Sequence, residues 1–320
     1  LMPLVLALGY DSIVAVAITY LACNLGFSAA MLNPFTVGIA QSIAGIQLYS
    51  GVEFRTLVWF VSTLVGCGFV MFYAMKIKKN PELSPMFEHD QVKREKLKST
   101  ESEHTEFTLR HKIIIAALFT SIALVVYGVL KLEFWIPQIA AVFLGLGIIS
   151  GLVGKLAPNE IAEAFTDGAK DMIGAAIMIG LAKSVMIIAQ NANIIDTILF
   201  NLANVVGQLP SLIASYIMFV IQMFINFFVS SGSGQAALTM PILAPLGDLV
   251  GISRQLSVLI YQLGDGFSNA MFPTSGVLIA CLGMAGVPYG KWLKWILPLQ
   301  AILFMTAIVF ITIASLIGWA

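Results

Sequence analysis

Charged residues are scarce in this chain of 320 residues, and their scarcity is the first limit on its class. Only 11% of the residues are charged, whereas 59% are hydrophobic and the mean hydropathy is +0.93. Soluble domains are about 25% charged and about 45–50% apolar, so the excess apolar surface must face lipid. The formal net charge is +0, which gives no indication of a nucleic-acid partner. The composition predicts a polytopic membrane protein.

Cysteine and histidine are also few, which argues against several kinds of active site. Cys23, Cys67 and Cys281 lie far apart in apolar segments without metal-ligand spacing, and we interpret them as small buried packing residues. All 3 histidines lie in one charged segment. No apolar segment therefore holds the imidazole that Ser-His, Cys-His or His-metal chemistry needs. The chain also begins without the basic region, short apolar core and cleavage site of a signal peptide.

Apolar and polar segments divide the chain into a series of expected parts. Runs of about 20 apolar residues are long enough to cross the hydrocarbon core. Residues 76–112 instead carry nine Lys or Arg and seven Asp or Glu, which predicts a solvated linker on the cytoplasmic side. Residues 157–171 have one apolar face, as is typical of an interfacial helix. The expected parts are a first transport unit (1–50), a transmembrane helix (51–75), a cytoplasmic charged linker (76–112), further transmembrane helices (113–156), an interfacial amphipathic helix (157–171), a transmembrane helix with a connector (172–208), a second transport unit (209–290) and a last transmembrane helix (291–320).

A short motif occurs twice, in two apolar segments that lie far apart in the chain. The sequence GFSAAM at 26–31 returns as GFSNAM at 266–271 with five of six residues identical, and NPFT at 33–36 corresponds to FPT at 272–274. Glycine and proline in such segments predict transmembrane helices that are broken midway. The spans expected between the copies are odd in number, so the copies should be inverted relative to each other. Paired broken helices in inverted halves predict an all-α secondary transporter with an inverted repeat.

The second copy follows another irregular feature, a predicted re-entrant helical hairpin. Residues 211–229 and 236–247 are its apolar limbs, and the sequence SSGSGQ at 230–235 joins them. Backbone polar groups cannot lie bare in hydrocarbon, so this tip should contact protein or a wet cavity. The first copy has only a second limb, residues 1–9. We therefore expect the matching tip to precede Leu1 in a longer protein.

The hairpin tip and the two breaks supply the candidate substrate site. Main-chain N–H groups at the start of the second limb would attract an anion such as a carboxylate. The predicted substrate contacts are Asn24, Ser28, Asn33 and Thr36 in the first copy, Ser231, Gly232, Ser233 and Gly234 at the tip, and Asp265, Ser268, Asn269, Thr274 and Ser275 in the second copy. The residues expected to break the helices are Gly26 and Pro34 in the first copy, and Gly264, Gly266 and Pro273 in the second.

Asp265 is the carboxylate among these candidates, whereas Leu25 occupies the corresponding position in the first copy. An intramembrane carboxylate is a functional hypothesis by default, because it needs a cation or a proton as its partner. The candidates are Na⁺ or H⁺ as a coupling ion, or an amino group of the substrate. No catalytic residue, metal centre or organic cofactor is expected beyond a Na⁺ ion near Asp265.

Together, these motifs resemble those of a known family. The stretches NFFVSSGSGQAALTMPILAPLGDLVGISRQL, QLGDGFSNAMFPTSGV and GFSAAMLNPFTVG are similar to the YfcC-type branch of the C4-dicarboxylate anaerobic carrier family, in the ion transporter superfamily. The resemblance covers essentially the whole chain. It implies a homodimeric carrier in the bacterial inner membrane, with a transport domain that moves like an elevator against a scaffold. It also implies that the helices at 54–75, 113–130 and 136–154 belong largely to the scaffold.

The resemblance implies two substrate classes. Members of the YfcC-type branch are described as basic amino acid antiporters. An arginine- or ornithine-like substrate would place its carboxylate at the Ser/Gly tip and an amine near Asp265. The leading hypothesis is therefore an amino acid transporter, working by antiport or ion-coupled symport. The alternative, implied by the family name, is a carrier of C4-dicarboxylates or other organic anions coupled to Na⁺ or H⁺.

A channel and an intramembrane enzyme are the competing classes. An aspartyl protease would need paired acids in YD and GxGD contexts, but Gln262 stands where the second motif requires glycine. A serine protease would need GxSG and a histidine, but Ser231 replaces the first glycine of that motif. A channel would not need two inverted units with broken helices, although fold alone does not decide function.

Overall fold

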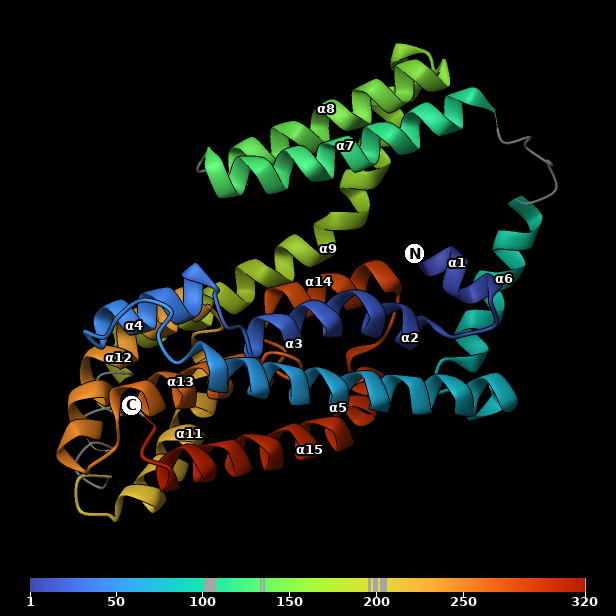
Figure 1. Ribbon diagram of the computed structural model, residues 1–320. Coiled ribbons are helices and arrows are strands. Elements are labelled where there is room, and N and C mark those ends of the chain that lie inside the picture. The colour runs from blue at the N-terminus through green and yellow to red at the C-terminus, as the bar shows by residue number, and fades with distance from the viewer. Residues whose placement is uncertain are drawn as a thin grey trace. The chain divides into compact units, whose positions relative to one another are not determined.

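The computed structural model describes residues 1–100, 108–132, 134, 136–194, 197, 201 and 206–319 (Figure 1). Every regular element within these residues is a helix, which confirms the all-α prediction for the described part of the chain. The α-helices are α1 (Met2–Ala7), α2 (Ser12–Val16), α3 (Ala22–Ser28), α4 (Ile39–Ile43), α5 (Val52–Lys79), α6 (Phe87–Thr100), α7 (Leu109–Lys131), α8 (Ile136–Gly154), α9 (Pro158–Asn191), α11 (Ser211–Phe228), α12 (Gly232–Leu249), α13 (Arg254–Ser268), α14 (Gly276–Ala285) and α15 (Tyr289–Leu316). Two π-helical turns, η1 (Ala17–Leu21) and η2 (Pro34–Gly38), and one 3₁₀ turn, η3 (Pro81–Leu83), complete the set.

Two compact units make up the chain. The first comprises Leu1–Glu95 and Gly174–Ala320, and the second comprises Lys96–Ile173. Within the second unit, α7 packs against α8. The helix α9 runs unbroken across the unit boundary from Pro158 to Asn191. The interfacial helix and the following span, expected as two elements that meet at 171, are thus one helix. The connector expected up to 208 lies partly outside the described residues.

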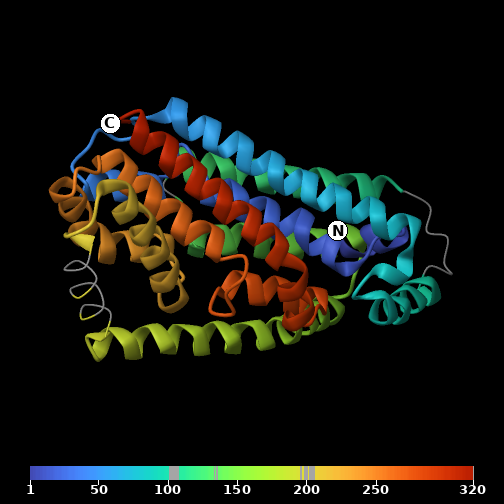
Figure 2. The same ribbon diagram turned by 90° about the horizontal axis from the view of Figure 1, so that it is seen from below.

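The centre of the first unit is α13. Every residue from Gln255 to Ser268 is buried, because α13 packs against α11, α12, α3 and α15. Figures 1 and 2 show α13 enclosed by these helices, with α5 and α15 running alongside each other at its flank. An apolar stripe alone would not bury all sides of a helix. Here polar side chains of α13 are buried too, and Tyr261, Gln262 and Ser268 form hydrogen bonds to neighbouring helices.

Both predicted broken helices are present. The first runs as a continuous helix through α2, η1 and α3 to Ser28, and resumes in η2 at Pro34. The second ends at Ser268 and resumes in α14 at Gly276. Pro34 and Pro273 thus lie at or within the breaks. Proline suits such positions because it lacks the N–H that a continuous helix would use.

Gly26, Gly264 and Gly266 were expected to break these helices, and the structure corrects that expectation. Gly26 lies inside α3, and the other two lie inside α13. Gly264 and Gly266 instead allow close packing. A Cβ on Gly266 would lie 2.5 Å from the Cβ of Ser28, and one on Gly264 would lie 2.6 Å from the Cβ of Gln222.

The two broken helices run in opposite directions through the first unit. At one end, Lys93 donates a hydrogen bond to Ser12 Oγ at the start of α2 and to the carbonyl of Ala285 at the end of α14. At the other end, Arg254 at the start of α13 donates to the carbonyl of Ala44 just after α4. The start of each broken helix therefore lies near the end of the other.

The predicted hairpin consists of α11 and α12, joined by residues 229–231. The two helices pack against each other and against α13. A hydrogen-bond network within the hairpin links its limbs: Gln222 Nε2 donates to Thr239 Oγ1 at 3.0 Å, and Gln235 Nε2 donates to Gln222 Oε1 at 2.6 Å. These internal bonds reduce the cost of placing the amides in an apolar environment, although Gln235 Oε1 has no partner among the described residues.

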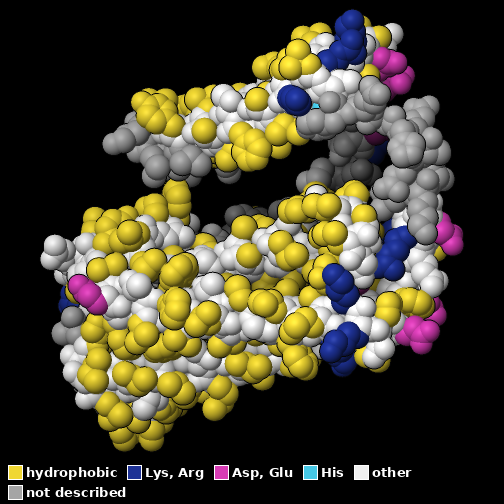
Figure 3. Space-filling model, turned by 45° about the vertical axis from the view of Figure 1, so that its right-hand side comes forward, with side chains coloured by type: hydrophobic (Ala, Val, Ile, Leu, Met, Phe, Trp, Pro, Cys, Tyr) yellow, Lys and Arg dark blue, Asp and Glu magenta, His cyan; other side chains and the backbone are white. Residues whose placement is uncertain are grey.

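Four described helices are long and apolar enough to cross a membrane. They are Val52–Lys79, Pro137–Gly154, Ser211–Phe228 and Tyr289–Leu316. Large apolar side chains on α5, such as Phe60, Leu64 and Phe72, are exposed. Figure 3 shows apolar side chains over much of the visible face of the first unit, with most of its charged side chains gathered at one end. This distribution fits an integral membrane protein.

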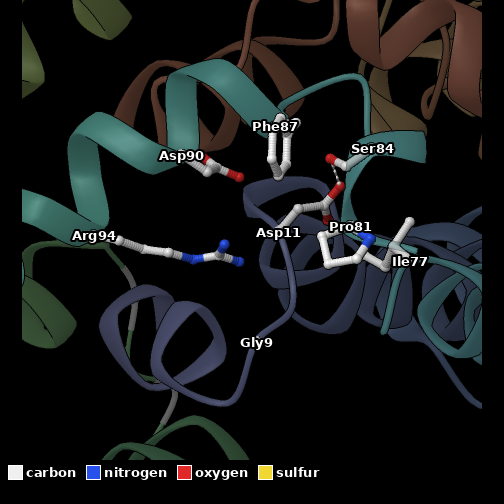
Figure 4. A pocket seen from close by; sticks show the side chains of 8 residues that line it. All are labelled: Gly9, Asp11, Ile77, Pro81, Ser84, Phe87, Asp90 and Arg94. Atoms are coloured by element: carbon white, nitrogen blue, oxygen red, sulfur yellow. Dashed lines mark hydrogen bonds between the residues drawn. The ribbon is translucent and has the colours of Figure 1, made fainter. Parts of the chain in front are cut away.

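The charged linker is less solvated than predicted, because residues 84–94, here named the docked segment, pack into the first unit. Ser84, Met86 and Asp90 are buried. Asp90 accepts a 2.7 Å hydrogen bond from the backbone N–H of Ser12, and Asp11 accepts a 2.6 Å bond from the hydroxyl of Ser84. Figure 4 shows Asp11 and Asp90, with the guanidinium of Arg94, pointing toward the same small space.

The docked segment also binds the second half of the chain. Lys93, already held by Asp90 at 3.0 Å, donates a 2.9 Å bond to the carbonyl of Ala285, at the end of α14. Lys291, in the first turn of α15, donates a 2.6 Å bond to the carbonyl of Pro85. The segment therefore fastens the start of the first broken helix to the end of the second.

Replacing Asp90 with Asn is expected to destabilise the protein by about 2 kcal/mol. An amide in place of the carboxylate must turn its NH₂ group, a donor, toward either the N–H of Ser12 or the ammonium of Lys93, so one of these two hydrogen bonds is lost. A buried hydrogen bond to a charged group is worth about 1.5–3 kcal/mol. Thermal unfolding in detergent measures the effect. Glu88→Gln, an exposed change in the same helical turn, is the matched control. Equal melting temperatures for the two variants would show that the docked segment does not stabilise the fold.

Candidate functional site

A cavity of about 260 Å³ lies between the two broken helices and the hairpin tip. Four of the predicted contacts line it: Asn24, Gly232, Asn269 and Ser275. The tip is joined to the second break by a 2.7 Å hydrogen bond from Ser230 Oγ to the carbonyl of Thr274. The full lining is Tyr20, Cys23, Asn24, Phe27, Ser230, Gly232, Asn269, Ser275, Gly276 and Val277.

The starts of two helices contribute to the wall of this cavity. Gly232 is the first residue of α12, and Gly276 is the first residue of α14. The first four N–H groups of a helix lack intrahelical partners and carry the positive end of the helix dipole. None of the lining residues is Asp, Glu, Lys, Arg or His. The wall is therefore neutral in formal charge and presents two N-terminal ends, which is an arrangement that attracts carboxylates.

Asp265 lies beside the hairpin tip, behind the cavity wall. Its Oδ2 atom is 3.2 Å from the position that a Cβ on Gly232 would occupy. The side chain of Asn269 interacts with the carboxylate from one helical turn later. Neither carboxylate oxygen, however, accepts a hydrogen bond of ordinary geometry from a described residue, although Asp265 is only 1% exposed. A buried, ionised carboxylate without partners is strongly unfavourable, so this group calls for a cation or a proton.

Other oxygen atoms near Asp265 are also unsatisfied. The hydroxyl of Thr36 is buried and has no hydrogen-bond partner among the described residues, and the same is true of the side-chain oxygen of Asn226. Thr36 approaches Gly232 from the first broken helix, and its Cγ2 lies 2.7 Å from the position that a Cβ on Gly232 would occupy. The described residues contain no group of three or more His, Cys, Asp or Glu side chains that could hold a metal ion. A cation here would therefore be held by one carboxylate and neutral oxygens.

Asn226, on α11, is a site residue that the sequence reasoning missed. Its Nδ2 atom donates to the backbone carbonyl of Asp265 at 2.8 Å, to Ser268 Oγ at 2.8 Å and to Asn269 Oδ1 at 3.0 Å. It thereby fixes the end of α13 just before the break. The available signal was the presence of two amides, Gln222 and Asn226, in the otherwise largely apolar run of α11.

Tyr20 is another missed residue with a clear structural role. It lines the cavity from the first broken helix, and its hydroxyl donates a 2.9 Å hydrogen bond to the carbonyl of Asn269 in the second break. The remaining missed lining residues are Cys23, Phe27, Ser230, Gly276 and Val277.

The other predicted contacts lie near the cavity or support its frame. Ser28 donates to the carbonyl of Asn24 within α3. Ser268 donates a 2.7 Å bond to the carbonyl of Gly264. The hydroxyl of Thr274 is buried without a partner among the described residues. Two residues cap helical turns instead of facing the cavity: Asn33 accepts from the N–H of Phe35, and Ser231 accepts from that of Gly234. Ser233 lies in the first turn of α12, outside the cavity lining.

The acids in the YD and GD dipeptides that an aspartyl protease would use, Asp11 and Asp265, do not form one site. Asp11 caps α2 and accepts hydrogen bonds from Tyr73 and Ser84 in the docked region. Asp265 lies instead beside Gly232 at the hairpin tip. A catalytic dyad requires two carboxyl groups that share one site, so this pair offers none.

Comparison with known proteins gives a consistent family assignment. The profile of the family described as C4-dicarboxylate anaerobic carrier matches residues 1–316. The chain is 42% identical over 328 aligned positions to the Escherichia coli K12 protein named "Putative basic amino acid antiporter YfcC", covering 99% of this chain and 64% of that protein. It is 34% identical over 307 positions to an "Uncharacterized protein" of Haemophilus influenzae, covering 95% of this chain and 60% of the relative. No solved structure gives a significant match.

The chain thus spans less than two thirds of the length of these two curated relatives. Within that span, the match leaves out only the last residues of the chain, and it includes both broken helices, the hairpin and the charged linker. On this evidence the chain belongs to the C4-dicarboxylate anaerobic carrier family.

Proposed function

We propose that the protein is a secondary transporter that moves a small basic amino acid, of the arginine or ornithine type, across the bacterial inner membrane. The observation that carries this proposal is one neutral cavity with two helix N-termini in its wall and an unpartnered carboxylate behind Gly232. The substrate carboxylate would bind the N–H groups at the starts of α12 and α14. An amine or guanidinium of the substrate would be drawn toward Asp265.

Two further observations support this function. Membership of a carrier family favours transport over an enzymatic activity. The name of the Escherichia coli relative refers to basic amino acid antiport, which matches a substrate with both charges. In this proposal, exchange of one amino acid for another needs no additional ion, whereas symport would use Na⁺ or H⁺ at Asp265.

A carrier of C4-dicarboxylates or other organic anions is the second candidate. It is favoured by the two helix N-termini, which suit two carboxylates, and by the lack of an acid among the lining residues. In that case Asp265 and the nearby unsatisfied oxygens would hold the coupling Na⁺ or H⁺. The two candidates thus differ in what neutralises Asp265: the substrate itself in the first, and the coupling ion in the second.

The proposed transport cycle follows from the paired broken helices. The inverted repeat, elevator-type movement and homodimeric assembly that the resemblance implies are part of this proposal. The antiparallel course of the two broken helices supports the repeat. Such paired breaks place a substrate site near the middle of the bilayer, where access can alternate between its two sides.

Counterflow in liposomes distinguishes the candidates. The full-length protein is reconstituted, the liposomes are preloaded with one unlabelled solute, and uptake of radiolabelled arginine, ornithine or succinate is followed. Saturable uptake of arginine or ornithine, competed by the other, is the expected result. Saturable uptake of succinate alone, dependent on Na⁺ or a pH gradient, would transfer the assignment to the second candidate. A current that never saturates with solute would overturn both, since it indicates a channel.

A further inference from the structure

Arg55, in the first turn of α5, is a buried cation that the proposed substrate site does not use. Its side chain is only 1% exposed, and it takes part in none of the ion pairs formed by the described residues. A guanidinium stays protonated in proteins. Burying an unpaired charge is very unfavourable unless strong hydrogen bonds compensate it. The groups around Arg55 must therefore compensate its buried charge with hydrogen bonds.

Neutral groups provide this compensation. Arg55 Nη1 donates to Gln262 Oε1 at 2.6 Å, and Nη2 donates to Gln255 Oε1 at 3.3 Å. The guanidinium also lies over the ring of Trp319, 5.4 Å from its centroid. Both glutamines belong to α13, the central helix that carries Asp265. One cation thus contacts α13 at two positions that are two helical turns apart.

The chemistry of arginine fixes the orientation of both glutamines. A guanidinium has only donors, so each glutamine must turn its oxygen toward Arg55 and its amide nitrogen away. Gln262 Nε2 then donates a 2.7 Å hydrogen bond to the carbonyl of Ala30, and Gln255 Nε2 donates to Ser50 Oγ. Without Arg55, the Gln262 amide could rotate and present its oxygen to the carbonyl of Ala30, which would be repulsive. Gln255 would keep one donor to its oxygen, Gln41 Nε2, at 3.3 Å.

These two contacts fasten both ends of one segment, residues 30–50, to α13. Ala30 follows α3 in the first break, and Ser50 directly precedes the turn into α5. Gln41, between them, donates to the carbonyl of Ser50 at 3.0 Å and to Gln255 Oε1 at 3.3 Å. Three hydrogen bonds between this segment and α13 therefore converge on the two glutamines that Arg55 holds. A fourth, from Arg254 to the carbonyl of Ala44, does not involve them.

Segment 30–50 forms part of the frame of the substrate cavity. It carries Thr36, whose side chain packs against Gly232 at the hairpin tip, next to Asp265. A shift of the segment would move Thr36 away from Gly232. The tip would then lose one of its contacts with the first broken helix; another is with Phe27, whose Cζ lies 2.8 Å from the position that a Cβ on Gly232 would occupy.

We propose that Arg55 is a positioning residue for transport: by orienting Gln262 and Gln255 it holds segment 30–50, and with it Thr36, against the hairpin tip. This inference rests on the proposed transport function. It also assigns α5 to the body that contains both broken helices, as the division of the chain into units does, whereas the family resemblance placed this helix largely in the scaffold.

The test is a double-mutant cycle of Arg55→Met and Gln262→Leu in the full-length protein, with Arg110→Met as control. Arg110 has a similar place, in the first turn of α7, but is exposed. Each single change is expected to raise the solute concentration for half-maximal counterflow by about tenfold. Both changes have this effect because each breaks the same chain of hydrogen bonds, from Arg55 through Gln262 to the carbonyl of Ala30. The double variant should be no worse than either single one. Arg55→Lys should recover only part of the loss, since an ammonium keeps the charge but lacks the planar fork.

A second measurement does not depend on transport. Hydrogen–deuterium exchange of residues 30–50 should be faster in Arg55→Met and Gln262→Leu than in wild type, and unchanged in Arg110→Met. Any of three results would overturn the inference. The single variants could show the wild-type solute concentration for half-maximal counterflow, the losses in the double variant could be strictly additive, or hydrogen–deuterium exchange over residues 30–50 could be unchanged. If wild type transports none of the solutes but the exchange pattern is as expected, the proposed function fails while the positioning of the segment stands.

Discussion

Asp265→Asn is expected to abolish the dependence of transport on its cation while making the ligand-free protein more stable. The substitution keeps the size of the side chain and removes its charge. Losing one partner of a buried ion pair costs about 3–5 kcal/mol, which corresponds to about 100-fold or more in apparent affinity for the cation. The free protein should gain stability, because a carboxylate that is 1% exposed and without ordinary hydrogen bonds is no longer buried.

Three measurements check this prediction. Counterflow gives the solute affinity, its variation with Na⁺ and pH identifies the cation, and thermal unfolding in detergent without solute gives the stability. Asp248→Asn is the control, since Asp248 is exposed and paired with Arg254 at 2.8 Å. Lower stability in Asp265→Asn, together with unchanged dependence on solute, Na⁺ and pH, would make Asp265 a structural residue and remove it from the site.

Gly266→Ala is expected to destabilise the protein by several kcal/mol and to eliminate transport, whereas Gly26→Ala should be tolerated. A Cβ on Gly266 would overlap the backbone of Ser28 and lie 2.6 Å from its Oγ, so α3 and α13 would be forced apart. Overpacking of this kind costs about 1–3 kcal/mol and more where backbone must move. The same shift would break the 3.2 Å hydrogen bond from Asn24 Nδ2 to the carbonyl of Gly266 beside the cavity.

Gly26 is an unusually close control, because it holds the same position in the repeated motif GFSAAM. A Cβ added to Gly26 would have nothing within 4 Å of it. Alanine in a helix interior is more favourable than glycine by about 1 kcal/mol, so Gly26→Ala should be neutral or slightly stabilising. Thermal unfolding and counterflow of the two variants measure the contrast. Similar losses in both would mean that the glycines act through helix flexibility and not through the contact with Ser28.

Much of the fold was predictable because it depends on local sequence features. The repeated motif and its prolines located both breaks, and the Ser/Gly tip located the hairpin. These features act on the backbone over a few residues, so the chain itself reveals them. They also led to four of the cavity-lining residues: Asn24, Gly232, Asn269 and Ser275.

The parts that were missed depend on contacts between distant residues. Composition alone makes residues 76–112 a solvated linker, yet Asp90 is buried because Ser12, which is 78 residues away, supplies two donors. Arg55 stood at the edge of a predicted span, where a solvated charge is ordinary. Its burial depends on Gln262, which lies 207 residues later. Likewise, a glycine that breaks a helix and one that admits a neighbouring helix look the same in a sequence.

The docked segment has a consequence for the order of folding. Lys93 forms its bond to Ala285 across 192 residues, and Lys291 reaches Pro85 across 206. During synthesis from the N-terminus, the first broken helix and the docked segment emerge long before these partners do. The fastening of residues 84–94 can therefore be completed only after α14 and the start of α15 have been made. Until then, the N-terminal helices must persist in the membrane while Lys93 lacks its Ala285 acceptor. The side of the cavity that α11 to α14 will close is also still open at that stage.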